Sequence, residues 1–319
     1  MKPWTLLGSR LPSSGLSCLG LFCLGLFCLG LCLPTVWGNS LQAQATETWR
    51  SWNQPVEPFR IAGNLYYVGA TDIAAYLVTT PEGHIVIDGG FPETAPLIRD
   101  SITALGFDIT DVKILLNSHA HFDHSGGLAA LQAWSGAEVW IHERDAPIIE
   151  SGGKGDFFLD ADDAAFPPVG VDRRLKHGDS VTLGDTTLTA HLTAGHTKGC
   201  TTWSMEVEDG DSTLLAVSVC STSVLPGLDL IDNAAYPEIA DDYARTFERL
   251  EALDCDIFLA PHGQFIDLDR KRQEMKDPST QGNPFVDPEG YREYVAKGKR
   301  RFSKVLEEQR AEATPPQRG

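Results

Sequence analysis

Three histidines and one aspartate lie within six residues, directly after a short apolar run. The run, Val112–Leu116, has the length and composition of a buried strand, and a helix-like segment follows at 128–134. The polar cluster consists of His119, His121, Asp123 and His124. It therefore occupies a loop that leaves the end of a strand, where α/β folds commonly place their chemistry.

The spacing of this cluster favours a site for two metal ions. Imidazole nitrogens and carboxylate oxygens bind zinc in tetrahedral sites at about 2.0–2.2 Å. If the loop folds back, His119 and His121 can converge on one ion. Asp123 and His124 then point away from it and can serve a second ion. The alternative is a polar loop whose histidines are solvated or pair with acids.

The overall composition restricts the partners of the chain. Its 319 residues are 42% hydrophobic and 22% charged, which is ordinary for a globular protein. The net charge of −18 argues against nucleic acid as a partner, because phosphate binding needs a basic surface. An anionic small molecule stays possible, since a bound metal ion can dominate the local field.

The first 45 residues have the pattern of a secretory signal peptide. They contain Lys2 and Arg10 but no acidic residue, then an apolar run at 16–37 and the small-x-small sequence Ala43-Gln44-Ala45. We therefore expect a periplasmic or secreted protein without stable membrane association once the signal is cleaved. The apolar run is also long enough to span a bilayer, so an uncleaved anchor is the alternative.

The remaining residues, 46–319, predict a single domain built from mixed strands and helices in two similar halves. The Trp- and Pro-rich segment 46–58 predicts an extended lead-in, and the tail from Ala311 predicts disorder. Strands are predicted at 65–68, 74–79, 84–88, 112–116, 138–141, 181–183, 186–192, 201–207, 213–219 and 257–260, and helices at 94–105, 128–134, 239–253 and 291–309.

Two further histidines lie in the same setting as the metal cluster. His196 follows the strand predicted at 186–192, and His262 directly follows the strand predicted at 257–260. Both are flanked by small residues in strand-end loops, where a convergent site would draw its ligands. Other histidines open, end or lie within strands or turns, and we do not expect them to bind metal: His84, His142, His177 and His191.

At these positions the sequence resembles the metallo-β-lactamase superfamily, and more narrowly the zinc β-lactamases of subclass B-three. The resemblance covers nearly all of residues 48–275. Besides the metal loop, the matching stretches are 52–55, 59–68, 87–90, 152–158, 166–169, 193–203 and 260–262. The resemblance implies an α/β (α+β) fold, namely an αββα sandwich in which two mixed sheets are flanked by helices.

The resemblance also implies roles for individual residues. Two zinc ions would be bound, the first by His119, His121 and His196 and the second by Asp123, His124 and His262. Asp123 would in addition orient the attacking water. Asp88 matches an aspartate near the site that is usually structural. Ser221 and Ser223 would hold the substrate carboxylate, although both could equally be loop hydroxyls that satisfy nearby backbone groups.

The implied activity is hydrolysis of the β-lactam amide bond of antibiotics, including carbapenems, by water that the metal ions activate. A lactonase or a thioesterase of the glyoxalase II type shares the metal loop and is an alternative. Those enzymes carry a bridging aspartate where this chain has Val219-Cys220-Ser221-Thr222. A non-enzymatic zinc-binding protein is a further alternative, and the sequence leaves the oligomeric state open.

Three cysteines remain after the signal segment. Cys200 and Cys220 are predicted at neighbouring strand ends, where they could form a disulfide, and an exported location would permit it. Two buried thiols are the alternative. Cys255 then has no partner and is expected to be buried.

Overall fold

The computed structural model describes residues 47–159 and 164–313. The predicted signal peptide, 1–45, therefore lies outside the described residues. Residues Ala45–Gly319 form one compact unit. No helix in the described ranges is long and apolar enough to cross a membrane.

The first sheet is mixed and has seven strands in the order β1-β2-β3-β4-β5-β6-β7. Its first four strands are antiparallel, and β4 to β7 are parallel. The strands are β1 (Phe59–Ala62), β2 (Leu65–Tyr67), β3 (Tyr76–Thr80), β4 (Gly83–Ile87), β5 (Val112–Leu116), β6 (Glu138–His142) and β7 (Arg173–Leu175).

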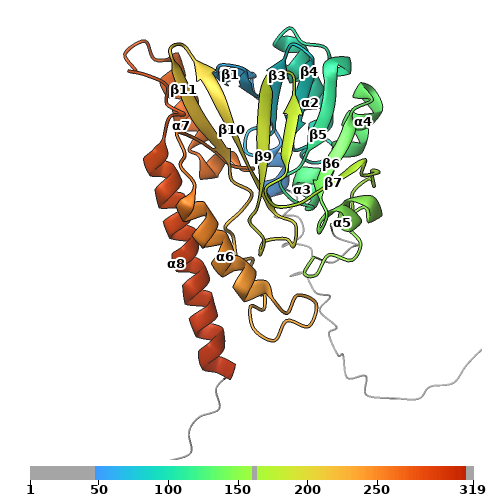
Figure 1. Cartoon of the computed structure of the whole chain (residues 1–319), viewed down its shortest axis with the longest axis vertical. Helices are drawn as coiled ribbons and strands as arrows, with labels where there is room; N and C mark the ends of the chain where they lie inside the picture. Colours follow the sequence, from blue (N-terminus) through green and yellow to red (C-terminus); the bar gives the residue numbers. More distant parts are fainter. Residues whose placement is uncertain (1–46, 160–163, 314–319) are drawn as a thin grey trace, which may run out of the picture. The chain divides into compact units, whose positions relative to one another are not determined.

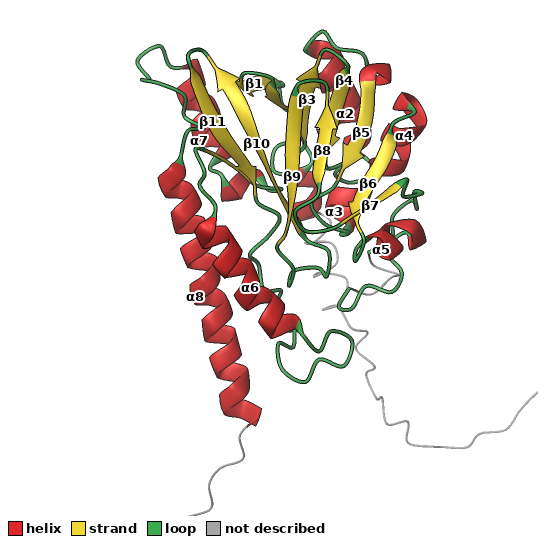
Figure 2. Cartoon of the chain, viewed as in Figure 1, coloured by secondary structure: helices red, strands yellow, loops and turns green. Residues whose placement is uncertain are grey.

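The second sheet has five strands in the order β12-β11-β10-β9-β8. Only β12 runs parallel to its neighbour, so this sheet is mixed as well. The strands are β8 (Ser180–Leu183), β9 (Thr186–Leu192), β10 (Thr201–Asp209), β11 (Ser212–Ser218) and β12 (Ile257–Leu259). The sheets pack face to face (Figure 2), and Ile87 and Leu116 of the first share a core with Leu188 and Trp203 of the second.

Helices cover the outer faces of both sheets (Figure 1). A second apolar core joins Ile98 and Leu131 to Val86 and Val139, so α2 and α4 pack on the first sheet. Phe247 and Phe302 place α6 and α8 in the core of the second sheet. The predicted αββα sandwich is therefore confirmed. The helices are α2 (Thr94–Ala104), α3 (Phe122–Ser125), α4 (Leu128–Ser135), α5 (Ala146–Ser151), α6 (Ile239–Ala252), α7 (Leu268–Lys276) and α8 (Pro288–Ala313), with short 3₁₀ turns η1 (Ile109–Asp111) and η2 (Gly263–Phe265).

Two terminal predictions were wrong in part. Residues 47–52 are helical rather than extended, and Trp49 and Trp52 pack against the rings of Phe122 and His262. The tail predicted to be disordered from Ala311 is still part of α8 as far as Ala313. The rest of the tail, 314–319, lies outside the described residues.

A disulfide joins Cys200 to Cys220, as predicted. It links the start of β10 to the residues that follow β11. Cys255 is buried and free, and burial raises the pKa of its thiol to about 12. Its sulfur is therefore an unreactive part of the core.

Candidate metal centre

Three loops at strand ends converge on one rim of the sandwich. The loop after β5 carries His119, His121, Asp123 and His124, and α3 begins within it. The loop between β9 and β10 carries His196, and His262 follows β12. The backbone folds this way locally because Gly195, just before His196, adopts φ of +133° against the ring of Tyr243.

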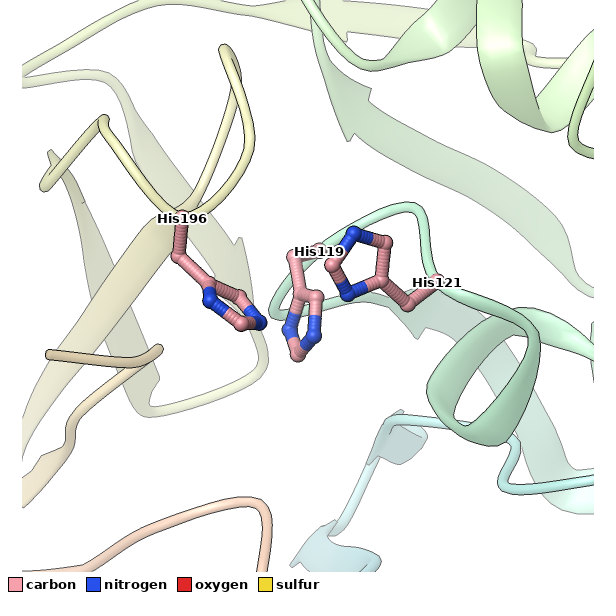
Figure 3. A group of neighbouring side chains, drawn as sticks. All are labelled: His119, His121 and His196. Carbon is pink, nitrogen blue, oxygen red and sulfur yellow. The ribbon is translucent and has the colours of Figure 1, made fainter. Parts of the chain in front are cut away.

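Three histidines form the first group of candidate ligands. Figure 3 shows the rings of His119, His121 and His196 turned toward one another, with His196 reaching in from a separate loop. Their ligand atoms all lie within 4.8 Å of one another, and all three residues are buried. The ring centroids are 4.7–4.8 Å apart. The three imidazoles can therefore bind one metal ion together.

A second group adjoins the first. Ligand atoms of His119, Asp123 and His124 lie within 4.8 Å of one another. Asp123 Oδ2 lies 3.3 Å from His124 Nε2 and 3.6 Å from His262 Nε2. The rings of His124 and His262 are 5.0 Å apart. The structure thus brings all six predicted ligands together, with His119 between the two groups.

Hydrogen bonds fix the orientation of two ligands of the first group. His119 Nδ1 lies 2.9 Å from Ser118 Oγ, which donates its own hydrogen to Asp88 at 2.8 Å. His196 Nδ1 donates to the carbonyl oxygen of Ser223 at 3.0 Å. A proton held on Nδ1 leaves the Nε2 lone pair of each ring free for a metal ion.

Asp88 holds the metal loop, as expected for a structural residue. Its Oδ1 accepts the backbone N–H of Ser118 at 2.6 Å and the side-chain amide of Asn117 at 2.9 Å. Its φ of +68° is unusual for a residue other than glycine. Asp88 therefore anchors the loop from the end of β4 without entering the ligand groups.

The protonation states suit metal binding. Burial lowers the pKa of His119 well below its ordinary value, that of His121 to about 4 and that of His196 to about 3. Burial raises the pKa of Asp123, but the positive charge of His124 outweighs this effect and leaves it below its ordinary value. The first group therefore offers neutral imidazoles, and Asp123 offers an ionised carboxylate, the forms that bind metal. Burial lowers the pKa of His124, but the charge of Asp123 outweighs this effect and raises it, so metal binding at His124 would release a proton.

The donor set fits zinc. It consists of nitrogen and oxygen donors, which zinc prefers. Nε2 of His121 and Nε2 of His124 are buried without a hydrogen-bond partner among the described residues. Unpartnered buried polar atoms of this kind are rare unless a ligand satisfies them.

Comparison with known proteins identifies the family. A family model described as the metallo-β-lactamase superfamily matches residues 68–262. The chain belongs to the metallo-β-lactamase superfamily. The native FEZ-1 metallo-β-lactamase from Legionella gormanii is 44% identical, with a TM-score of 0.79 over 81% of this chain and 98% of that one. BJP-1, a subclass B3 metallo-β-lactamase of Bradyrhizobium japonicum, is 41% identical, with a TM-score of 0.77 over 83% of this chain and 99% of that one.

More distant relatives have other activities. A hydroxyacylglutathione hydrolase of Bradyrhizobium sp. (strain ORS 278) is 28% identical over 172 residues, which are 54% of this chain and 56% of that protein. The N-acyl homoserine lactonase AttM of Agrobacterium fabrum is 28% identical over 173 residues, or 46% and 64%. This metallo-β-lactamase superfamily member thus spans little more than half the length of the hydroxyacylglutathione hydrolase. The family model and the matches to FEZ-1 and BJP-1 confirm the predicted resemblance to metal-dependent hydrolases of subclass B3.

The two serines predicted to contact substrate differ in their availability. The hydroxyl of Ser221 is buried and accepts the backbone N–H of Ser223 at 3.2 Å. Ser223 is half-buried, and its carbonyl oxygen accepts hydrogen bonds from His196 and from Tyr243 Oη at 2.6 Å. The Ser221 hydroxyl therefore already accepts a backbone hydrogen bond. The Ser223 hydroxyl forms no hydrogen bond with the residues that the structure describes.

The histidines not expected to bind metal lie in other surroundings. His142 Nδ1 accepts the backbone N–H of Arg144 at 3.2 Å, and His191 Nε2 lies 2.8 Å from Ser204 Oγ. His84 packs edge-on against Phe107. None of them belongs to either ligand group within the described residues.

Several residues of the centre were missed by the sequence interpretation. Trp52 packs edge-on against His262 with ring centroids 5.3 Å apart, and Trp49 packs against Phe122 at 5.1 Å. The tryptophan-rich composition of the lead-in was the available signal. Asp72 lies 2.8 Å from His262 Nδ1, but an isolated aspartate before a strand gives no signal of this role.

Proposed function

We propose that this protein is an exported dinuclear zinc β-lactamase. The observation that carries the proposal is the convergence of six nitrogen and oxygen donors from separate loops, in a chain 41–44% identical to metallo-β-lactamases along nearly their whole length. The substrates are β-lactam antibiotics, including carbapenems. A single metallo-hydrolase domain, 46–319, would follow a cleaved signal peptide.

In this proposal His119, His121 and His196 hold the first zinc ion, and Asp123, His124 and His262 hold the second. When bound, the two ions supply a water that is activated near neutral pH and Lewis-acid polarisation of the substrate carbonyl. Asp123 accepts a hydrogen bond from the attacking water and directs its lone pair at the β-lactam carbonyl carbon. Its carboxylate is ionised at neutral pH, so it can only accept.

Substrate binding is assigned to the loop after β11. β-Lactam antibiotics carry a carboxylate, and we assign its binding to Ser221 and Ser223. The half-buried Ser223 is the better placed of the two, because the Ser221 hydroxyl already accepts a backbone N–H. Ser223→Ala should therefore raise KM more than it lowers kcat, and Ser221→Ala should raise KM by a smaller factor.

Export to the periplasm or the medium is part of the proposal. The acid-free segment 1–45 supports it through its signal-peptide pattern. The disulfide between Cys200 and Cys220 supports it as well, because disulfides persist in oxidising compartments.

The deciding experiment measures hydrolysis of a chromogenic cephalosporin and a carbapenem by the purified protein, with and without a chelator. Turnover that a chelator abolishes and added zinc restores is expected. A folded protein that carries two zinc ions and hydrolyses neither substrate would contradict the β-lactamase proposal.

A thioesterase or lactonase is the second candidate, because a hydroxyacylglutathione hydrolase and an N-acyl homoserine lactonase are relatives. The stretch Val219-Cys220-Ser221-Thr222 offers no carboxylate to bridge two metals, which weighs against this candidate. A hydroxyacylglutathione and an acyl-homoserine lactone belong in the same assay. Faster turnover of either than of the β-lactams would favour this candidate.

A further inference from the structure

Asp145 joins the two loops that carry the first group of histidines. It lies three residues after the end of β6, directly before α5, and only 2% of its surface is exposed. Its Oδ2 accepts the backbone N–H of Ala120 at 3.0 Å and the hydroxyl of Thr197 at 2.7 Å. Its Oδ1 accepts the backbone N–H of Gly199 at 2.6 Å.

The donors come from the segments that carry the ligands. Ala120 stands between His119 and His121, and Thr197 directly follows His196. One buried carboxylate therefore bonds to both sides of the three-histidine group. Nothing in its contacts places it among the ligand atoms themselves.

The close approach of the third donor needs glycine at position 199. A Cβ on Gly199 would lie 2.6–2.7 Å from the backbone nitrogen, Cβ and Cγ of Asp145, which is closer than real Cβ atoms come. The junction thus depends on the pair of Asp145 and Gly199. If Asp145 only terminated β6, its side chain would have no reason to approach Gly199 so closely.

We propose that Asp145 is a positioning residue for the first metal ion. By bonding to Ala120 and Thr197 it sets the distance between the loop that carries His119 and His121 and the loop that carries His196. The inference rests on the metal centre of the proposed function but not on the substrate. It is therefore tested through zinc affinity rather than through turnover.

Asparagine at this position tests the carboxylate with little change in shape. Its amide group presents an oxygen on one side and an NH₂ on the other. In either orientation the NH₂ faces a backbone N–H, that of Gly199 or that of Ala120, so one of the two bonds is replaced by an opposed pair of donors. The two loops should separate, and zinc affinity should fall about 10–100-fold, the range typical for groups that support metal ligands.

The experiment uses the full chain with His262→Ala as background, so that one zinc ion reports on the three-histidine group. Competition with a chromophoric chelator measures its affinity. Asp145→Asn should weaken zinc binding about 10–100-fold, and Thr197→Val, which removes one bond, should weaken it less. Asp256→Asn is the matched control, because the Asp256 carboxylate also accepts a backbone N–H, that of Leu215 at 2.9 Å. Asp256 precedes β12, whereas His262 follows the opposite end of that strand.

Three outcomes would overturn the inference. If Asp145→Asn lowers only the unfolding midpoint, as Asp256→Asn does, and leaves zinc affinity unchanged, then Asp145 is merely structural. If Asp145→Asn does not fold, an unchanged affinity in Thr197→Val decides against the inference. If the His262→Ala protein itself does not bind zinc, both the proposed metal centre and the inference are wrong. Absence of β-lactam turnover alone would contradict the proposed substrate but not the inference about Asp145.

Discussion

The carboxylate of Asp72 lies 2.8 Å from Nδ1 of His262, and the opposite ring nitrogen, Nε2, lies 3.6 Å from Asp123. Because a carboxylate can only accept, the proton must sit on Nδ1 and the Nε2 lone pair faces the site. Asp72 also accepts the backbone N–H of Gln264 at 2.7 Å, so it holds both the ring and the turn that carries it.

Asp72→Ala should therefore weaken binding of the second zinc ion about 10–100-fold and leave the first in place. Metal analysis after dialysis against limiting zinc should find two ions on the wild type and one on the variant. Asp179→Ala is the control, since Asp179 accepts the backbone N–H of Lys176 in a distant turn. Two retained ions in Asp72→Ala would show that the His262 ring is held without this carboxylate.

Removal of a ligand itself should have a larger effect. His119→Ala and Asp123→Ala should each lower kcat/KM for a β-lactam by more than about 100-fold, beyond the usual effect of a supporting group. His177→Ala is the control, because His177 is exposed and lies outside both ligand groups. Full activity in His119→Ala or Asp123→Ala would contradict the assignment of the metal centre.

The sequence predicted the ligands because each lies directly after a strand. The parallel strands β4, β5 and β6 bring their carboxyl ends to one edge, and His119 and Asp123 follow β5 there. His196 follows β9, which is antiparallel to both of its neighbours, so this rule does not apply to it. His196 and His262 were predicted instead from the small residues around them in strand-end loops. Pattern reasoning therefore indicated where the polar side chains gather, whereas the αββα fold and the full set of predicted ligands came from the family resemblance.

Other features were not, for physical reasons. Asp72 and Asp145 act through hydrogen bonds to segments far away in sequence, and no local pattern marks such contacts. Helix α7, Leu268–Lys276, was missed because six of its nine residues are charged. Only Leu268 and Lys271 of this helix are buried, so it has no apolar stripe for periodicity to detect.

The zinc-free protein should become less stable in acid through its buried histidines. Burial lowers the pKa of His196 from 6.5 to about 3. Below pH 6.5 the unfolded chain therefore binds a proton at this residue that the folded chain does not, so the unfolding free energy falls as the pH falls. His196→Gln removes this one contribution. Between pH 7 and pH 5 the variant should gain about 2 kcal/mol relative to the wild type.

Urea unfolding of the chelator-treated wild type and His196→Gln at both pH values measures this difference. The comparison of variant with wild type cancels the other titrating groups, including Asp145, whose pKa burial raises to about 6 and whose effect on stability has the opposite sign. A free-energy gap that stays constant between the two pH values would show that His196 is not buried in the neutral form.

The disulfide should stabilise both the fold and the metal loop. Cys200 and Cys220 are 20 residues apart, and closing a loop of this length contributes about 3 kcal/mol in the chain-entropy model. Thr201, next to Cys200, donates its backbone N–H to the carbonyl oxygen of Ser118 at 2.8 Å, directly before the ligand His119. Loss of the disulfide should therefore lower zinc affinity as well as stability.

Replacing Cys200 and Cys220 together with serine should lower the unfolding free energy by about 3 kcal/mol. A reductant should bring the wild type down to the same midpoint and leave the double variant unchanged. Cys255→Ala is the control, because its buried thiol forms no disulfide and its replacement should not remove the response to reductant. A wild-type midpoint that is insensitive to reductant, at a concentration shown by mass analysis to open the bridge, would mean that the native packing alone holds the two strand ends together.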